Sequence, residues 1–397
     1  MKAFWRNIGI MLVLFLGSAA AFAGIKKGPY LMYEGSNTSM AVLWQTDATE
    51  SNLIHWGTDS TYSIGQTTST EYGDHQHKFV ISGLQLNTKY YYQVEGYGSG
   101  SFRTAPDSSA KSVKILSYGD TRSTPANQEL VVARMRAAYA ADPALQSIAL
   151  HTGDWVSGDG ESYWTSQFFV NTNPQMHAFQ SEVPIEGVRG NHEGAGKYFK
   201  KYFPYPYVSN FYWSYDYGPV HVVVLDQYAS YAPGSAQYNW LIKDLASTTR
   251  PWKILMFHEP AWAAGVHENN ATAQKYLQPL CKKYRVDLVL NGHNHYYARA
   301  VVDGVSHITN GGGGAPLYTP DPTYPYIVIT DESFSYCEID IQDTTLALTA
   351  RRADGSVIET FSINHPVPHA KANLNTRTEQ TVTTVVPDSF SECNMLI

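Results

Sequence analysis

The most constraining feature of this sequence is that short apolar runs stop abruptly at metal-binding types of side chain. The run Val286–Leu290 is followed by Asn291-Gly292-His293-Asn294-His295. Buried strands of parallel sheets read as such runs, and ligands of open α/β sheets gather at the carboxyl ends of these strands. Glycine allows a close backbone approach there. A single His-x-His pair more often belongs to a surface or a hydrogen-bonded core than to a metal site.

Four other segments end in a similar way, and together they change that balance. The runs Val113–Tyr118, Ser147–Thr152, Val183–Arg189 and Trp252–Phe257 precede Gly-Asp, Gly-Asp, Gly-Asn-His-Glu and His-Glu-Pro, respectively. Two carboxylates, one amide and three imidazoles suit a pair of ions such as zinc, iron or manganese. Asp residues after strands also cap helices, but five coincident motifs argue against that alternative. The candidate metal ligands are Asp120, Asp154, Asn191, His258, His293 and His295.

The order of these motifs resembles that of the calcineurin-like metallophosphoesterases, and within them the purple acid phosphatase branch. The resemblance implies an α/β fold, a four-layer αββα sandwich with two metal ions at strand ends along one edge. It also implies that Asp154 bridges the two ions. Asp120 and His295 would join Asp154 on the first ion, and Asn191, His258 and His293 would complete the second, as the family pattern has it.

Two positions depart from the family pattern. Many metallophosphoesterases have a histidine ligand two residues after the first Asp, where this chain has Arg122, which stays protonated and cannot bind a metal. Purple acid phosphatases have a ferric-binding Tyr three residues after the second Asp, where this chain has Ser157. Three protein ligands are therefore expected on the first ion, with water, Ser157 or Asp159 as candidates for the rest. The purple colour that this Tyr gives to the purple acid phosphatases is therefore not expected of this protein.

Arg122 and His192 are candidate catalytic residues. The planar fork of Arg122 suits bidentate contact with phosphate, although the side chain is equally suited to an ion pair with Asp159 or Glu161. By resemblance, His192 lies beside the metals without binding them, where it stabilises phosphoryl oxygens or protonates the leaving alkoxide. Glu193 is expected to orient His192.

His267 is the third candidate catalytic residue. It follows His258 by nine positions, which matches a substrate-contacting histidine of the purple acid phosphatases. Without that resemblance it would read as an ordinary loop histidine.

Residues 24–106 predict a small all-β domain. Short alternating runs separated by Gly, Asn, Ser and Thr indicate antiparallel strands, and no helical period occurs. Trp44, Leu84 and Tyr91 resemble the core residues of fibronectin type III modules, which commonly precede the catalytic domain of purple acid phosphatases. The histidines of this region are predicted to be surface residues: His55, His75 and His77.

The catalytic domain is predicted over residues 112–362, after a linker at Ala105–Lys111. Helices are expected at Gln128–Ala141, Gln237–Ser247 and Ala271–Tyr284, alternating with strands. Residues 363–397 form a polar tail with one possible edge strand, Thr381–Val386.

The amino-terminal residues 1–23 read as a secretory signal peptide. Lys2 and Arg6 precede the apolar run Ile8–Leu16, and Ala21-Phe22-Ala23 forms an Ala-x-Ala cleavage site. The run is too short to span a membrane comfortably, so a periplasmic or secreted protein without a membrane partner is expected. The three cysteines lie away from the metal motifs, and their odd number leaves at least one unpaired.

These features predict metal-dependent hydrolysis of phosphate esters, with phosphomonoesters as the expected small-molecule partners, by a metal-activated water at a dinuclear site of Fe, Zn or Mn. The net charge of −7 argues against nucleic acid as a partner. One alternative is a phosphodiesterase or nucleotide hydrolase. An alternative of another class is a surface adhesion or glycan-binding protein built on the same scaffold.

Overall fold

The computed structural model describes residues 24–144, 146–366 and 383–385. The predicted signal peptide at residues 1–23 and most of the polar tail lie outside this range. Within the described part of the chain, no helix is both long and apolar enough to cross a membrane. Cys281 and Cys337 are buried and unpaired.

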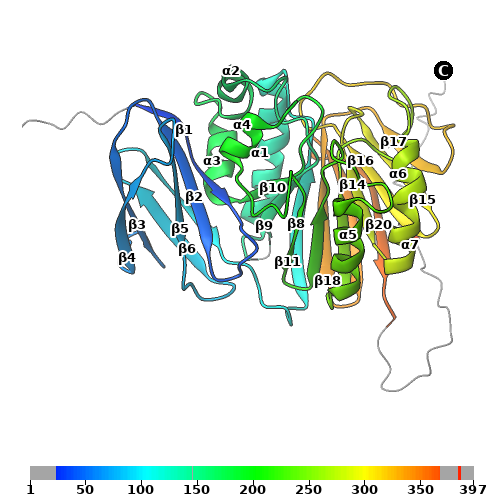
Figure 1. The fold of residues 1–397 in the computed structure, drawn as a ribbon, viewed down its shortest axis with the longest axis horizontal. Coiled ribbons are helices and arrows are strands. Elements are labelled where there is room, and N and C mark those ends of the chain that lie inside the picture. Colours follow the sequence, from blue (N-terminus) through cyan, green and yellow to red (C-terminus); the bar gives the residue numbers. More distant parts are fainter. Residues whose placement is uncertain (1–23, 145, 367–382, 386–397) are drawn as a thin grey trace, which may run out of the picture.

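The amino-terminal region is all-β, as predicted, and consists of two small antiparallel sheets (Figure 1). One contains β1 (Ile25–Met32), β2 (Met40–Thr46) and β5 (Gln76–Ile81), and the other contains β4 (Gly65–Thr70), β3 (Ser51–Gly57), β6 (Lys89–Val94) and β7 (Gly98–Arg103). Side chains facing inward from both sheets form the shared core, among them Val42, Trp44, Ile54, Tyr92 and Phe102.

Two predictions in this region are wrong. Tyr91 is only half-buried, and its neighbours Tyr90 and Tyr92 supply the core rings, because successive side chains of a strand face opposite sides. His77 is fully buried rather than on the surface. Its ring stacks on Trp44 at 4.9 Å, and burial lowers its pKa, which favours the neutral form that packs in the core.

Two seven-stranded mixed sheets follow. The first has the order β10 (Ile185–Gly187), β9 (Gln146–His151), β8 (Ser112–Tyr118), β18 (Ser335–Gln342), β19 (Thr345–Arg352), β20 (Val357–Asn364) and β21 (Thr383–Val385). The second has the order β11 (Trp213–Tyr217), β12 (Val220–Val224), β13 (Trp252–Met256), β14 (Leu288–Asn291), β16 (Val305–Asn310), β15 (Tyr297–Val302) and β17 (Ile327–Asp331). β8, β9 and β10 run parallel, as do β12, β13, β14 and β16.

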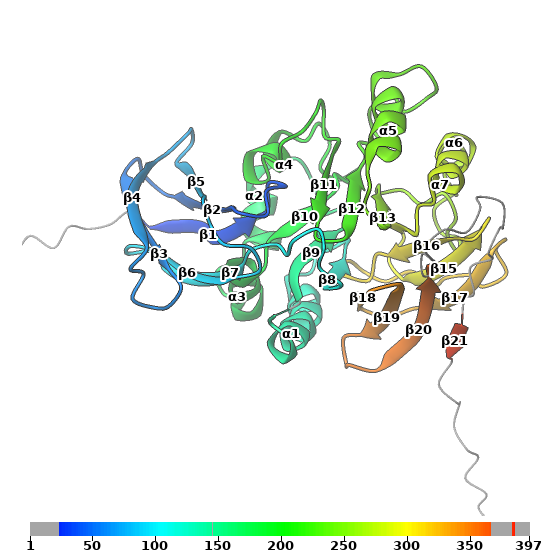
Figure 2. The ribbon, with the colours of Figure 1, turned by 90° about the horizontal axis from the view of Figure 1, so that it is seen from below.

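Helices cover the outer faces of both sheets, which confirms the four-layer α/β prediction. Figure 2 shows α1 (Pro125–Ala141) and α3 (Pro174–Glu182) on the side opposite α5 (Ala236–Ser247), α6 (Ala271–Tyr276) and α7 (Gln278–Tyr284). Alternation along β13 explains the layering. Ile254 and Met256 join the core between the sheets, whereas Leu255 packs with Leu241 of α5 on the outer face.

The helix predicted at residues 271–284 is instead two helices, α6 and α7, that meet at Leu277. Asn270 caps α6 by accepting a hydrogen bond from the backbone N–H of Ala273. Pro279 lies in the first turn of α7. Its ring fixes the backbone and removes an N–H donor, so proline is tolerated at a helix start and interrupts a continuous helix.

The predicted edge strand of the tail is confirmed where the chain is described, because β21 pairs antiparallel with β20. At the start of the tail, His365 stacks on Trp252 at 3.8 Å and its Nε2 lies 2.7 Å from Asp287 Oδ1. These contacts fasten the end of β20 to the second sheet.

Candidate metal centre

All six predicted metal ligands lie at the carboxyl ends of parallel strands, on the edge shared by the two large sheets. β8 leads to Asp120, β9 to Asp154 and β10 to Asn191, whereas β13 leads to His258 and β14 to His293 and His295. The structure therefore brings together residues that are up to 175 positions apart in the chain, from Asp120 to His295.

Asp120, Asp154 and His295 form the first group of candidate ligands. One ligand atom from each lies within 4.8 Å of the others, and all three residues are buried. His295 Nε2 lies 3.7 Å from Asp120 Oδ1. Asp154 belongs to both groups, because its Oδ1 also faces His258 of the second group.

Asp154, Asn191, His258 and His293 form the second group. His258 Nε2 lies 3.2 Å from Asp154 Oδ1 and 3.1 Å from Asn191 Oδ1. His293 Nδ1 lies 3.1 Å from the same amide oxygen. These atoms are acceptors or lone-pair donors when the imidazoles are neutral, so they repel one another unless a proton or a cation lies between them.

Backbone carbonyls set the tautomers of two imidazoles. His258 Nδ1 donates to the carbonyl oxygen of Thr152 at 2.8 Å, and His295 Nδ1 donates to that of Pro316 at 2.7 Å. In each ring Nδ1 therefore carries a proton, and Nε2 is the nitrogen that faces the site. Outer hydrogen bonds of this kind commonly orient metal-binding histidines.

Three candidate ligands have a left-handed backbone conformation, with φ of 56° at Asp120, 52° at Asp154 and 70° at His293. Such φ values are uncommon outside glycine and cluster at functional sites. The strand ends hold one another in place, because the backbone N–H of His293 lies 2.9 and 3.0 Å from the two oxygens of Asp120. A Cβ on Gly292 would meet that same carboxylate, which explains the glycine.

Electrostatics show that the centre requires positive charge. Burial raises the pKa of Asp120 well above its usual range. Burial alone would also raise the pKa of Asp154, but the neighbouring His258 lowers it below its usual range. For His258, the carboxylates of Asp154 and Asp120 outweigh burial and raise the pKa to about 10. Because a bound cation supplies the same charge, the donor set fits metal ions.

His192 lies beside these groups, but Glu193 does not orient it, contrary to the prediction. His192 Nδ1 donates to the carbonyl oxygen of Ser157 at 3.2 Å, and its Nε2 lies 3.7 Å from Asp154 Oδ2. The buried Glu193 carboxylate instead accepts backbone N–H groups of Asp154, Val156 and Gly190 at 3.1, 3.1 and 2.7 Å. Adjacent side chains diverge here, and Glu193 stabilises the loop that carries Asp154.

Arg122 points into the first group. Its Nε lies 3.4 Å from Asp154 Oδ2, and its Nη2 lies 3.3 Å from His295 Nε2. The alternative partners considered from the sequence have other contacts. Asp159 accepts the backbone N–H of Tyr198 at 3.0 Å, and Glu161 lies 3.3 Å from Lys27 Nζ.

His267 also reaches the centre. Its ring centroid lies 4.2 Å from that of His293, and its backbone N–H donates to Asn294 Oδ1 at 3.0 Å. Burial and the nearby charge of Arg122 lower its pKa. Tyr318 was not predicted as a site residue. Its ring stacks on that of His295 at 4.1 Å and lies 5.5 Å from that of His267, so Tyr318 lines the candidate metal centre beside these two histidines.

The remaining first-ion candidates from the sequence are unsupported by the geometry. Ser157 Oγ donates to Gln167 Oε1 at 2.9 Å and lies 3.1 Å from Ser123 Oγ. Other histidines of the domain serve packing or hydrogen bonding, as expected. His151 stacks on Trp155 at 3.8 Å, and His307 Nε2 lies 2.9 Å from Gln278 Oε1.

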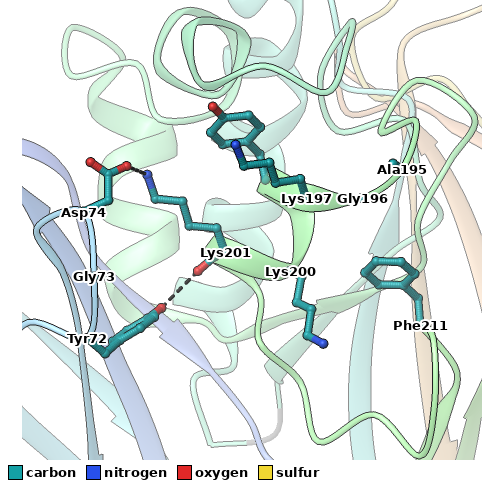
Figure 3. Close-up of a pocket in the computed structure, with 10 residues that line it drawn as sticks. Tyr72, Gly73, Asp74, Ala195, Gly196, Lys197, Lys200, Lys201 and Phe211 are labelled. Atoms are coloured by element: carbon teal, nitrogen blue, oxygen red, sulfur yellow. Dashed lines mark hydrogen bonds and ion pairs between the residues drawn. The ribbon is translucent and has the colours of Figure 1, made fainter.

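A cavity of about 660 Å³ lies apart from the six candidate ligands, beside the junction of the all-β region and the short helix α4 (Lys197–Tyr202) (Figure 3). It is lined by Tyr72, Gly73, Asp74, Ala195, Gly196, Lys197, Tyr198, Lys200, Lys201 and Phe211. The side chain of Lys201 contacts Asp74, and Tyr72 Oη donates to the carbonyl oxygen of Lys201 at 3.0 Å. None of its lining residues is a candidate ligand.

Comparisons with known proteins agree with this fold. The calcineurin-like phosphoesterase family model matches residues 114–297, and the purple acid phosphatase N-terminal domain model matches residues 27–115. The chain is 29% identical to purple acid phosphatase 18 of Arabidopsis thaliana over 350 residues, which cover 78% of this chain and 77% of that protein. It is 26% identical to the Fe(3+)-Zn(2+) purple acid phosphatase 12 of the same plant over 353 residues, or 72% and 71% of the two chains.

Among solved structures, the yellow lupin purple acid phosphatase PPD1 superposes with a TM-score of 0.71 at 19% identity, covering 87% of this chain and 77% of that one, which shows a shared fold. The chain thus contains a calcineurin-like phosphoesterase domain. A domain of the purple acid phosphatase N-terminal type precedes it, and these curated relatives are purple acid phosphatases.

Proposed function

We propose that this protein hydrolyses phosphomonoesters at a dinuclear metal site formed by Asp120, Asp154, Asn191 and three histidines. The observation that carries the proposal is the convergence of metal-binding donor atoms on one place. Asp154 Oδ1 lies 3.2 Å from His258 Nε2, Asp120, Asp154 and His295 lie together, and the Nε2 atoms of His258 and His295 face inward because their Nδ1 protons are donated to carbonyls. Two bound cations would neutralise phosphate oxygens and activate a water for attack on phosphorus.

The chain's own residues would position the ester and its leaving group. His192 donates its Nδ1 proton to the carbonyl oxygen of Ser157, so in the imidazolium form its Nε2–H would give its proton to a departing alkoxide and leave the neutral ring. The side chain is 31% exposed, which allows contact with substrate. The ring of His267 lies 4.2 Å from that of His293, so His267 would contact an ester bound at this group. Arg122 would hold a phosphate oxygen through its guanidinium N–H groups once bound metal has taken its place beside His295.

The first test is removal of the shared carboxylate. Asp154→Asn should lower both the metal content and the rate of phosphomonoester hydrolysis, the latter on the order of a hundredfold or more, because neither group keeps its charged oxygen. Metal analysis and hydrolysis of para-nitrophenyl phosphate measure the two effects. Asp303→Asn is the matched control, since Asp303 is an exposed residue paired with Lys282. Full activity after exhaustive chelation would contradict the proposal.

A panel of esters separates the alternatives. Faster hydrolysis of phosphomonoesters than of bis(para-nitrophenyl) phosphate or ATP is expected. The reverse order would favour a phosphodiesterase or a nucleotide hydrolase. Metal binding without hydrolysis of any ester would instead favour the adhesion or glycan-binding alternative.

We also propose that the protein is exported, on the basis of the charged start, the short apolar run and Ala21-Phe22-Ala23. The mature chain should begin at Gly24. Amino-terminal sequencing of the protein recovered from outside the cytoplasm measures this, and an intact Met1 would contradict it.

A further inference from the structure

The side chain two residues after Asp120 is a permanent cation inside the first group of candidate metal ligands. Arg122 Nε lies 3.4 Å from Asp154 Oδ2, and Nη2 lies 3.3 Å from His295 Nε2. The Arg122 side chain is only 16% exposed, and both of its partners are buried. Guanidinium remains charged at any pH at which the protein is folded.

The guanidinium uses the same lone pair that a metal ion would use. His295 donates its Nδ1 proton to the Pro316 carbonyl, so its Nε2 is an acceptor and Arg122 Nη2 is the donor. Asp154, another member of the first group, faces Arg122 Nε with its Oδ2 atom. A metal ion bound by Asp154 and His295 would therefore compete with Arg122 for both atoms.

Arg122 is held by charge more than by well-aligned hydrogen bonds. Within the described part of the chain, its buried Nε has no acceptor in hydrogen-bonding geometry, although the Asp154 carboxylate lies at ion-pair distance. Nη1 donates to the neutral Ser123 hydroxyl at 3.2 Å. By contrast, the buried Arg299 guanidinium donates to both oxygens of Glu359, at 2.8 and 2.7 Å. Arg122 is thus the more easily displaced of the two.

The second group has no permanent cation of this kind. Asp154 Oδ1, Asn191 Oδ1 and His258 Nε2 face one another at 3.1 to 3.2 Å. Among the contacts of the described residues, no lysine or arginine reaches these three atoms. A metal ion can replace a proton on an imidazole, but it cannot deprotonate a guanidinium, so only in the first group must a whole side chain move out.

We propose that Arg122 occupies the first metal position as a built-in counter-cation, so that the two positions fill in order. The second group binds its metal first and tightly. The first group binds a metal only after the guanidinium has moved out, and so binds it more weakly. This inference rests on the proposed dinuclear site and concerns how that site is loaded.

Titration of chelator-treated protein with Zn²⁺ tests the proposal without relying on activity. Calorimetry and metal analysis after equilibrium dialysis should show two zinc ions per chain, the second bound about tenfold or more weakly than the first. In Arg122→Met, which removes the charge and keeps a similar length, the weaker site should tighten by about tenfold or more, towards the tighter one. Arg122→Lys keeps the charge and should remain closer to the wild type.

Arg134→Met is the matched control, because Arg134 lies on the outer face of α1, where its Nε donates to the carbonyl oxygen of Ala353. Two equally tight zinc sites in the wild type, unchanged in Arg122→Met, would overturn the role of Arg122 and leave the dinuclear site standing. A lower melting temperature in Arg122→Met with unchanged zinc affinities would also overturn it, since Arg122 would then be a structural ion-pair partner. No zinc binding by any variant would overturn the proposed metal site itself.

Discussion

At the scale of single residues, the sequence predicted which side chains meet but not how the backbone holds them. The pattern of Gly followed by a candidate ligand at a strand end predicted that these side chains meet, since parallel strands end on one edge of a sheet. The left-handed conformations of Asp120, Asp154 and His293 were not readable, because each depends on contacts between different strand ends. The sequence also does not show that the carbonyls of Thr152 and Pro316 orient His258 and His295, since every residue has a carbonyl.

Sequence neighbours were a poor guide to contacts at this scale. Glu193 was assigned to His192 because the two are adjacent, but its carboxylate binds backbone N–H groups of two loops. Arg122 was paired with Asp159 or Glu161 on sequence proximity, and it instead reaches Asp154 and His295. Tertiary folding decides such contacts, and the motif alone does not contain that information.

His221 gives a residue-scale prediction about pH. Its two ring nitrogens each lie 2.8 Å from a carboxylate, Asp216 Oδ1 and Asp244 Oδ2, and Arg250 Nε lies 2.9 Å from Asp216 Oδ2. Burial lowers the pKa of His221, but the two carboxylates outweigh it and raise the pKa to about 9. A raised pKa means that folding favours the protonated form, so the stabilisation is complete below the ordinary value of about 6.5 and disappears as pH rises through about 9.

We therefore expect His221→Gln to destabilise the protein most near pH 6, by at most about 3 kcal/mol. The difference from wild type should shrink towards zero above about pH 9. Urea denaturation of both proteins at several pH values measures it. His365→Gln, which removes a histidine paired with one carboxylate, is the matched control. A destabilisation that is independent of pH would show that His221 acts through packing rather than through its charge.

At the scale of elements, strands with a clear apolar alternation were predicted and polar or irregular ones were missed. β2 and β6 contain the apolar and aromatic residues typical of strands, whereas β4 does not. β4 is an edge strand with the sequence Gly-Gln-Thr-Thr-Ser-Thr, and edge strands tolerate polar residues on both faces. β1 contains two lysines, a glycine and a proline, so its composition argues against a strand, although it is paired with β2.

Helix prediction failed at Ala271–Tyr284, where the sequence contains one proline. The apolar spacing from Ala271 to Tyr284 continues through Pro279, so periodicity alone predicts one helix. The structure divides it at Leu277 because Pro279 begins a new helix. In this case a single residue with a fixed backbone outweighs a fourteen-residue pattern.

At the scale of the whole molecule, the all-β region and the α/β region are packed as one unit. Tyr30 of β1 lies 4.8 Å from Phe169 and 5.7 Å from Phe203, ring centre to ring centre, and its hydroxyl donates to the carbonyl oxygen of Tyr202 at 2.7 Å. Tyr33 donates its backbone N–H to Glu186 Oε1 at 2.6 Å. The sequence predicted two regions with a linker, but it contained no sign that they share a core.

A buried ion pair reinforces this junction. Lys27 of β1 is fully buried, and its ammonium group lies 2.6 Å from Gln45 Oε1 and 3.3 Å from Glu161 Oε1. Glu161 begins the short helix α2 (Glu161–Tyr163), seven residues after Asp154, and also contacts Lys201 at 3.4 Å. Burial lowers the pKa of Lys27 to about 8, so the charge of Lys27 depends on Glu161. The metal-site loop and the amino-terminal sheet are thereby coupled.

We expect Glu161→Ala to destabilise the folded protein by about 3 kcal/mol, near the lower end for breaking a buried pair, because Glu161 is partly exposed. Lys27→Met combined with Glu161→Gln should recover most of that loss, since no uncompensated charge remains buried. Calorimetry should show one unfolding transition for the wild type, because β1 belongs to the core of both regions, and a lower melting temperature for Glu161→Ala.

Glu95→Ala is the control, because Glu95 is an exposed partner of His55, and it should change stability by less than about 0.5 kcal/mol. If Glu161→Ala and Glu95→Ala have equal effects, the Lys27–Glu161 pair does not hold the two regions together, and the aromatic contacts of Tyr30 alone account for their packing.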